Sequence, residues 1–113
     1  MGKELRKNLR ISCSIPVLLR FVSRTPQEGW GTIYDISLGG IKLETRFHLE
    51  VGENIFLSFI LGDNFIFENT RGRIIRIEEK DGYFTCGIEF DHIVDKNHLK
   101  EGLYSILDAG TQK

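Results

Sequence analysis

Residues 53–61 read ENIFLSFIL and residues 65–79 read FIFENTRGRIIRIEE, with the three residues GDN between them. Apolar side chains occupy every second position of the first stretch. This period of two is typical of a strand with one buried face, and Gly, Asp and Asn favour tight turns. The stretch therefore predicts two antiparallel strands joined by a short turn, the longer one bent near Gly72.

The same alternation recurs on both sides of this pair. Asp81-Gly82 is a strong hairpin signal, and Pro16 indicates a sheet edge or the start of strand pairing. The further expected strands are residues 12–22, 30–36, 40–45 and 84–90. Six strands at this spacing predict an all-β barrel or sandwich.

The C-terminal residues change to a helical period. The apolar positions that follow the period are Leu99, Leu103, Ile106 and Leu107. Asp95 is expected to cap this helix at its start, and Gly110 is expected to end it. Apolar residues on the second strand faces (Leu18, Phe56, Ile60) suggest that the helix packs across the outside of the barrel.

Composition sets the class of protein. The chain has 113 residues, of which 41% are hydrophobic and 27% charged, so we expect one globular domain with a core of its own. No apolar stretch is long enough to span a bilayer, and no signal peptide is apparent, so a soluble cytoplasmic protein is expected. Cys13 and Cys86 form neither a disulfide framework nor a zinc-binding pattern; burial as small apolar side chains is the favoured interpretation.

Positive charge is concentrated at the start of the chain. Residues 1–24 hold six of the fifteen basic side chains but only one of the sixteen acidic ones. A local positive region on an acidic body suits a small anionic ligand. A solvated basic segment is the alternative.

Catalysis, metal binding and nucleic-acid binding have little support in the sequence. Ser37 is not in a nucleophile-elbow pattern, and the three histidines lack metal-ligand spacing; His92 and His98 are expected to face solvent or cap the helix. Eight phenylalanines would suit a single-stranded nucleic-acid binder, but most fall on inward faces. Trp30 is expected to pack at the barrel end, with a stacking surface as the alternative. We therefore expect no enzyme, no metal and no nucleic acid.

Two sequence motifs contain side chains suited to binding a ligand. Arg6 and Arg10 offer two guanidinium groups, and the segment Asp35–Gly40 (DISLGG) offers a carboxylate, a hydroxyl and a bare backbone. These groups together can hold a guanine base and its phosphate. The alternative is that Asp35 and Ser37 only organise a tight turn while the arginines are solvated.

In order and spacing, these motifs resemble those of the PilZ domain, the bacterial receptor module for cyclic di-GMP. The matching segments are residues 6–10 (RKNLR), Pro16-Val17 and Asp35–Gly40, with weaker agreement at Gly72 and at residues 87–90 (GIEF). The resemblance implies a six-stranded antiparallel β-barrel with a C-terminal α-helix packed on it. It also implies a flexible N-terminal ligand-binding arm (1–11), the barrel (12–91), and a helix and tail of the same domain (92–113).

The resemblance further implies a cyclic di-GMP receptor without a cofactor. Arg6 and Arg10 would grip phosphate oxygens and a guanine, and Asp35 would accept the hydrogen bonds that mark guanine. Ser37 would add a hydroxyl contact, and Gly40 would leave room for the ligand or the turn.

The implied mechanism is an arm that becomes ordered over the ligand and creates a surface for a downstream protein. Leu5 stands where an arginine accompanies binding of two ligand molecules in the family, so one ligand per domain is expected. The alternative is a PilZ-like protein-interaction module that acts without nucleotide.

Overall fold

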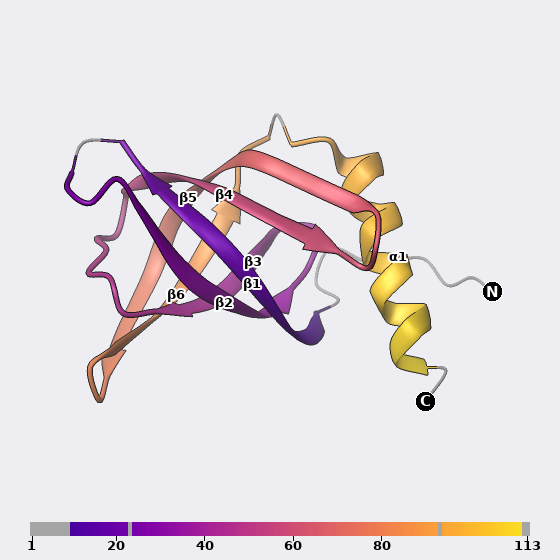
Figure 1. The fold of residues 1–113 in the computed structure, drawn as a ribbon, viewed down its shortest axis with the longest axis horizontal. Helices are drawn as coiled ribbons and strands as arrows, with labels where there is room; N and C mark the ends of the chain where they lie inside the picture. Colours follow the sequence, from indigo (N-terminus) through magenta and orange to yellow (C-terminus); the bar gives the residue numbers. More distant parts are fainter. Residues whose placement is uncertain (1–9, 23, 93, 112–113) are drawn as a thin grey trace.

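The computed structural model describes residues 10–22, 24–92 and 94–111. Six antiparallel strands form a closed barrel in the order β1-β2-β3-β6-β5-β4, and one helix follows them (Figure 1). The elements are β1 (Ile11–Phe21), β2 (Glu28–Ile36), β3 (Gly40–Thr45), β4 (Asn54–Leu61), β5 (Phe65–Lys80), β6 (Tyr83–Phe90) and α1 (Lys96–Thr111). The expected fold class, a six-stranded antiparallel barrel with a C-terminal helix, is confirmed.

The period of two places alternate side chains inside the barrel. Strand β4 shows this directly, since its inward residues are buried and the residues between them are not. The fully buried apolar side chains come from every strand and include Leu19, Ile33, Leu43, Leu57, Ile74 and Ile88. A single core therefore holds the sheet closed on itself.

Local backbone chemistry accounts for one turn and for the position of Pro16. Asp81 and Gly82 both have positive φ, 54° and 82°, as a two-residue hairpin turn between β5 and β6 requires. Pro16 pairs with Thr32 of β2, whereas the pairing of β1 with β4 begins only at Leu18. At Pro16, β1 is therefore paired with β2 alone, so the proline lies at a local sheet edge shortly before pairing with β4 begins, in agreement with both interpretations.

Helix α1 begins as expected but ends later. The Asp95 carboxylate accepts hydrogen bonds of 3.1 Å from the backbone N–H groups of Asn97 and His98, which is an N-cap. The helix continues to Thr111, so Gly110 lies inside it and does not end it.

The helix lies at one end of the barrel and not across its outer faces (Figure 1). Leu99 and Leu103 are buried, and a Cβ added at Gly102 would lie 2.8 Å from Leu61 Cδ1. The expectation of a helix covering the outer strand faces is therefore wrong, and Ile60 is 50% exposed. The helix instead buries Leu99 and Leu103 at the barrel rim, in the same core cluster as the inward-facing Leu61.

Two further side chains differ from expectation. Trp30 is 64% exposed, so the packing interpretation is wrong. The Phe47 ring occupies the space that a side chain at Gly29 would need, and the next residue along the strand, Trp30, points outward. His98 is half-buried, with its ring centroid 4.5 Å from that of Phe67, and so does not simply face solvent.

Candidate functional site

The end of β2 brings Asp35 close to Arg10. Asp35 pairs across the sheet with Ser12 of β1, and Arg10 precedes that strand by one residue. Arg10 Nη1 lies 3.8 Å from Asp35 Oδ2, and the two side chains are 53% and 18% exposed. An ion pair this exposed contributes only about 0–1 kcal/mol. Arg10 can therefore exchange Asp35 for another anion at a small cost in free energy.

Asp35 also has an unused acceptor. Its Oδ1 atom is buried and has no hydrogen-bond partner among the described residues. A buried acceptor without a partner typically costs about 1–3 kcal/mol. Asp35 therefore keeps one acceptor that none of the described residues uses.

The negative charge of Asp35 affects the pKa of the neighbouring Cys13 thiol. Burial, and to a smaller extent the negative charge of Asp35, raises the pKa of the Cys13 thiol to about 11. The thiol donates a 3.7 Å hydrogen bond to the backbone oxygen of Ile33. Cys13 therefore lies beside the site as a neutral group.

Ser37 is committed to the turn between β2 and β3. Its hydroxyl donates to the backbone oxygen of Gly40 over 3.4 Å and accepts from the backbone N–H of Gly39 over 3.2 Å. The backbone N–H of Ser37 also donates to Gly40 O, over 2.9 Å, and Ser37 is only 5% exposed. Of the two interpretations of the motif, turn organisation thus describes Ser37, whereas Asp35 pairs with an arginine.

Gly40 is required by the barrel itself. A Cβ at this position would overlap the backbone oxygen of Ile88 and lie 3.1 Å from its carbonyl carbon. Gly40 pairs with Glu89 where β3 meets β6, so the two backbones are in close contact. The glycine therefore serves the barrel whatever the ligand.

The β2–β3 turn is also held by hydrogen bonds from other elements. The backbone N–H of Phe90 donates to Gly39 O over 2.9 Å, and Lys96 Nζ donates to Leu38 O over 2.7 Å. Lys96 is the first residue of α1. The turn is thus fixed by β6 and by the helix together.

A small pocket of about 180 Å³ opens beside this turn. Sequence reasoning identified three of the residues that border it: Arg10, Ser37 and Gly40. It did not assign others to the site, among them Lys42, Ile75, Arg76, Gly87 and Glu89, although residues 87–90 (GIEF) match the family pattern. Lys42 could have been found, since it lies two positions after Gly40 on the outward face. The residues of β5 and β6 could not, because only barrel closure brings them here.

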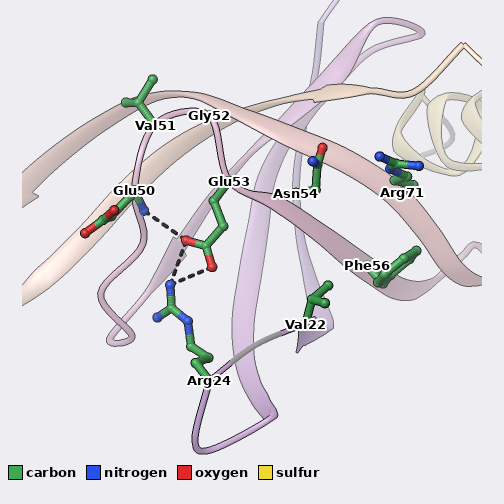
Figure 2. Close-up of a pocket in the computed structure, with 9 residues that line it drawn as sticks. All are labelled: Val22, Arg24, Glu50, Val51, Gly52, Glu53, Asn54, Phe56 and Arg71. Atoms are coloured by element: carbon green, nitrogen blue, oxygen red, sulfur yellow. Dashed lines mark hydrogen bonds and ion pairs between the residues drawn. The ribbon is translucent and has the colours of Figure 1, made fainter.

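A larger cleft of about 910 Å³ lies elsewhere, beside Arg24 and residues 50–54. Figure 2 shows the Arg24 guanidinium and the Glu53 carboxylate pointing toward each other. Arg24 Nη2 lies 2.6 Å from both oxygens of Glu53, and the other arginine of the cleft, Arg71, lies 3.5 Å from Asp91. Arg24 is thus held by both oxygens of a carboxylate and is less exposed than Arg10, which disfavours anion binding at that arginine.

The described part of the chain offers little support for metal binding or for a membrane-spanning helix. Its side chains contain no group of three or more His, Cys, Asp or Glu that could hold a metal ion. Of its helical segments, none has the length and apolarity needed to cross a membrane. Arg6, Leu5 and most of the expected arm lie outside the described residues.

The fold and the site define a class: a closed antiparallel barrel in which Arg10, Ser37 and Gly40 border one small pocket, while Asp35 near the end of β2 pairs with Arg10. The chain belongs to the PilZ domain family, whose sequence model matches residues 4–105. No curated protein sequence matches the chain.

Solved structures share this fold. A crystal structure of YcgR from Escherichia coli in complex with c-di-GMP superposes with a TM-score of 0.72 at 17% identity, covering 95% of this chain and 47% of that one. The Bacillus subtilis inhibitor of motility MotI/DgrA gives 0.71 at 18% identity, covering 98% and 54%. The K. pneumonia MrkH–c-di-GMP complex gives 0.73 at 18% identity, covering 98% and 56%. The chain therefore spans about half the length of these proteins.

Proposed function

We propose that this protein is a receptor for cyclic di-GMP. The observation that carries the proposal is the position of Arg10, which pairs with Asp35 and borders one pocket together with Ser37 and Gly40 of the β2–β3 turn. Membership of the PilZ family supports it, as do the YcgR and MrkH structures, which hold c-di-GMP.

Asp35 would select guanine. A guanine offers two adjacent donors, its ring N1–H and its exocyclic amine, and the buried Oδ1 of Asp35 has no protein partner among the described residues. Adenine offers no such donor pair on the same edge. The carboxylate would therefore accept a pair of charge-assisted hydrogen bonds from guanine, whereas adenine could donate only one, from its exocyclic amine.

Arg10 would exchange its carboxylate partner for the ligand. Its guanidinium is more than half exposed and lies 3.8 Å from Asp35, so the exchange requires little free energy. A guanidinium can form a forked contact with a phosphate and stack on a purine face. Arg6, four residues earlier, would supply the second guanidinium of the motif.

The roles of Ser37 and Gly40 are then positional. The Ser37 hydroxyl holds the turn through Gly39 and Gly40, and Gly40 lets β3 approach β6. These contacts would fix the backbone beneath the ligand before it arrives, which lowers the entropic cost of binding.

Signalling would pass through the N-terminal arm. In this proposal residues 1–11 close over one bound ligand, on the barrel of residues 12–91 with its helix and tail at 92–113. Ordering such a segment costs about 1–2 kcal/mol per residue, offset by the phosphate and guanine contacts. The closed arm would be the surface that a downstream protein recognises, in the cytoplasm and without catalysis.

Isothermal titration with cyclic di-GMP tests the proposal, with GTP and cyclic di-AMP as competitors. We expect a saturable isotherm with one ligand per chain, and an affinity loss of about 1.5–3 kcal/mol or more for Arg10→Ala. Arg20→Ala is the matched control, because Arg20 is an equally exposed arginine near the other end of β1 and pairs with Glu28. Recovery of unaltered ligand after prolonged incubation would agree with a receptor that is not an enzyme.

Three results would count against the proposal. Absent binding would favour the protein-interaction module that acts without nucleotide. Equal competition by cyclic di-AMP would remove the role given to Asp35. A stoichiometry of two ligands would refute the inference drawn from Leu5.

A further inference from the structure

A row of outward-facing residues crosses four strands beside the proposed site. Asp35 of β2 pairs with Lys42 of β3, Lys42 pairs with Gly87 of β6, and Gly87 pairs with Arg76 of β5. Neighbouring strands lie about 4.8 Å apart, so the Lys42 and Arg76 backbones are about 10 Å apart. Their long side chains border one pocket, with Gly87 between them.

Lys42 and Arg76 keep their charges available. In the part of the chain that the structure describes, neither takes part in an ion pair or hydrogen bond, unlike Arg20, Arg24 and Arg71. Arg10 borders the same pocket, so three cations lie there against two carboxylates, that of Glu89 in the lining and that of Asp35, which pairs with Arg10. Such an excess of positive charge in a small concave site attracts an anion.

Gly87 keeps the space between the two cations open. A Cβ there would make only ordinary contacts, 3.6 Å from Arg76 Cβ and 3.8 Å from Ile75 Cγ1. The backbone of the barrel therefore does not require a glycine at this position, in contrast to Gly40. Ile75, which is 45% exposed, adds an apolar wall to the pocket.

We infer that Lys42 and Arg76 form a second phosphate subsite over Gly87. The inference rests on the proposed function and extends it. A cyclic dinucleotide carries two phosphodiesters on one ring, so a receptor that holds one guanine at Asp35 also places a phosphate near the next strands. The pocket of about 180 Å³ is smaller than the roughly 300–1,000 Å³ of complete ligand pockets, so it takes one part of the ligand only.

Titration of matched variants with cyclic di-GMP tests this subsite. Arg76→Gln and Lys42→Met should each weaken binding by about tenfold or more, as expected for loss of a charge-assisted contact. Arg73→Gln is the control, because Arg73 lies on the same strand and is exposed but borders the neighbouring pocket. It should change the dissociation constant less than about twofold, the scale of a surface charge change.

Gly87→Val tests whether the space between Lys42 and Arg76 is needed for binding, without changing any charge. Valine suits a strand, so the thermal unfolding midpoint should be preserved while binding weakens by about tenfold. Equal effects of Arg76→Gln and Arg73→Gln would overturn the subsite, as would unchanged binding in Gly87→Val. If the wild type binds cyclic di-GMP and Arg10→Ala does not, either of these two outcomes would overturn the subsite and leave the receptor proposal intact. If the wild type itself fails to bind, both proposals fall.

Discussion

Lys96 Nζ lies 2.7 Å from the backbone oxygen of Leu38, so the first residue of α1 is bonded to the turn between β2 and β3. A lysine in the first helical turn is unfavourable to the helix dipole by about 0.3–1 kcal/mol. Its hydrogen bond, which involves a charged donor, contributes about 1.5–3 kcal/mol. The tertiary contact therefore outweighs the local penalty.

Lys96→Met should lower the free energy of unfolding by about 1 kcal/mol, the difference between these two effects. Urea denaturation measures this change. Lys100→Met is the control, because Lys100 is exposed on the same helix and no interaction of the described residues involves it. A Lys96→Met variant as stable as the control would show that the Leu38 contact contributes nothing.

Gly40→Ala should destabilise the barrel by about 3 kcal/mol, because the new Cβ overlaps the backbone oxygen of Ile88, which cannot move without breaking the β3–β6 pairing. Gly39→Ala is a strict control one residue away, since its Cβ would meet nothing closer than Ser37 Oγ at 4.0 Å. Thermal unfolding followed by circular dichroism distinguishes them. Equal midpoints for the two variants would contradict the structural role of Gly40.

Stability should fall at alkaline pH through Cys86. Burial, with a smaller contribution from the charge of Glu53, raises the pKa of this thiol from 9.0 to about 11. The unfolded chain loses its thiol proton at lower pH than the folded chain does. The stabilising effect is thus complete below pH 9 and is lost as the pH rises toward 11.

This loss should reach about 2 kcal/mol by pH 11 for Cys86 alone. Denaturant titrations of the wild type and of Cys86→Ala from pH 8 upward would reveal it as a difference in slope. Cys86→Ala should be less stable at pH 8, because it leaves a cavity, but its stability should fall less steeply. Parallel pH profiles would mean that Cys86 is not protected in the folded state.

Asp35→Asn should lower the affinity for cyclic di-GMP by about 1.5–3 kcal/mol while changing the free energy of unfolding by less than about 1 kcal/mol. The amide keeps the shape of the side chain, but its NH₂ group faces guanine donors where an acceptor is needed. Asp63→Asn, in the exposed turn between β4 and β5, controls for the loss of one charge. Retained affinity in Asp35→Asn would exclude guanine recognition by this carboxylate.

The elements could be predicted because their signals are local. The alternation from Ile55 to Leu61, the hairpin signal at Asp81-Gly82 and the cap at Asp95 each depend on neighbours a few residues away. The association of Arg10 with Asp35 could also be expected, from the motif spacing and the family resemblance.

What could not be predicted depends on contacts between distant segments. Trp30 is exposed because Phe47 fills the space beside Gly29, and α1 closes a barrel end because inward-facing apolar side chains are available there. Neither outcome follows from periodicity, which says that a face is apolar without saying what covers it.

The sequence by itself determined six strands, one helix and a guanidinium–carboxylate pair, because turn chemistry and side-chain period act within short windows of the chain. Only the tertiary structure decided that Lys42, Gly87 and Arg76 share one pocket, and that Lys96 reaches Leu38. The physical reason is closure of the barrel: the partners of β3, β6 and β5 are fixed by burial of a common core, which depends on all six strands at once.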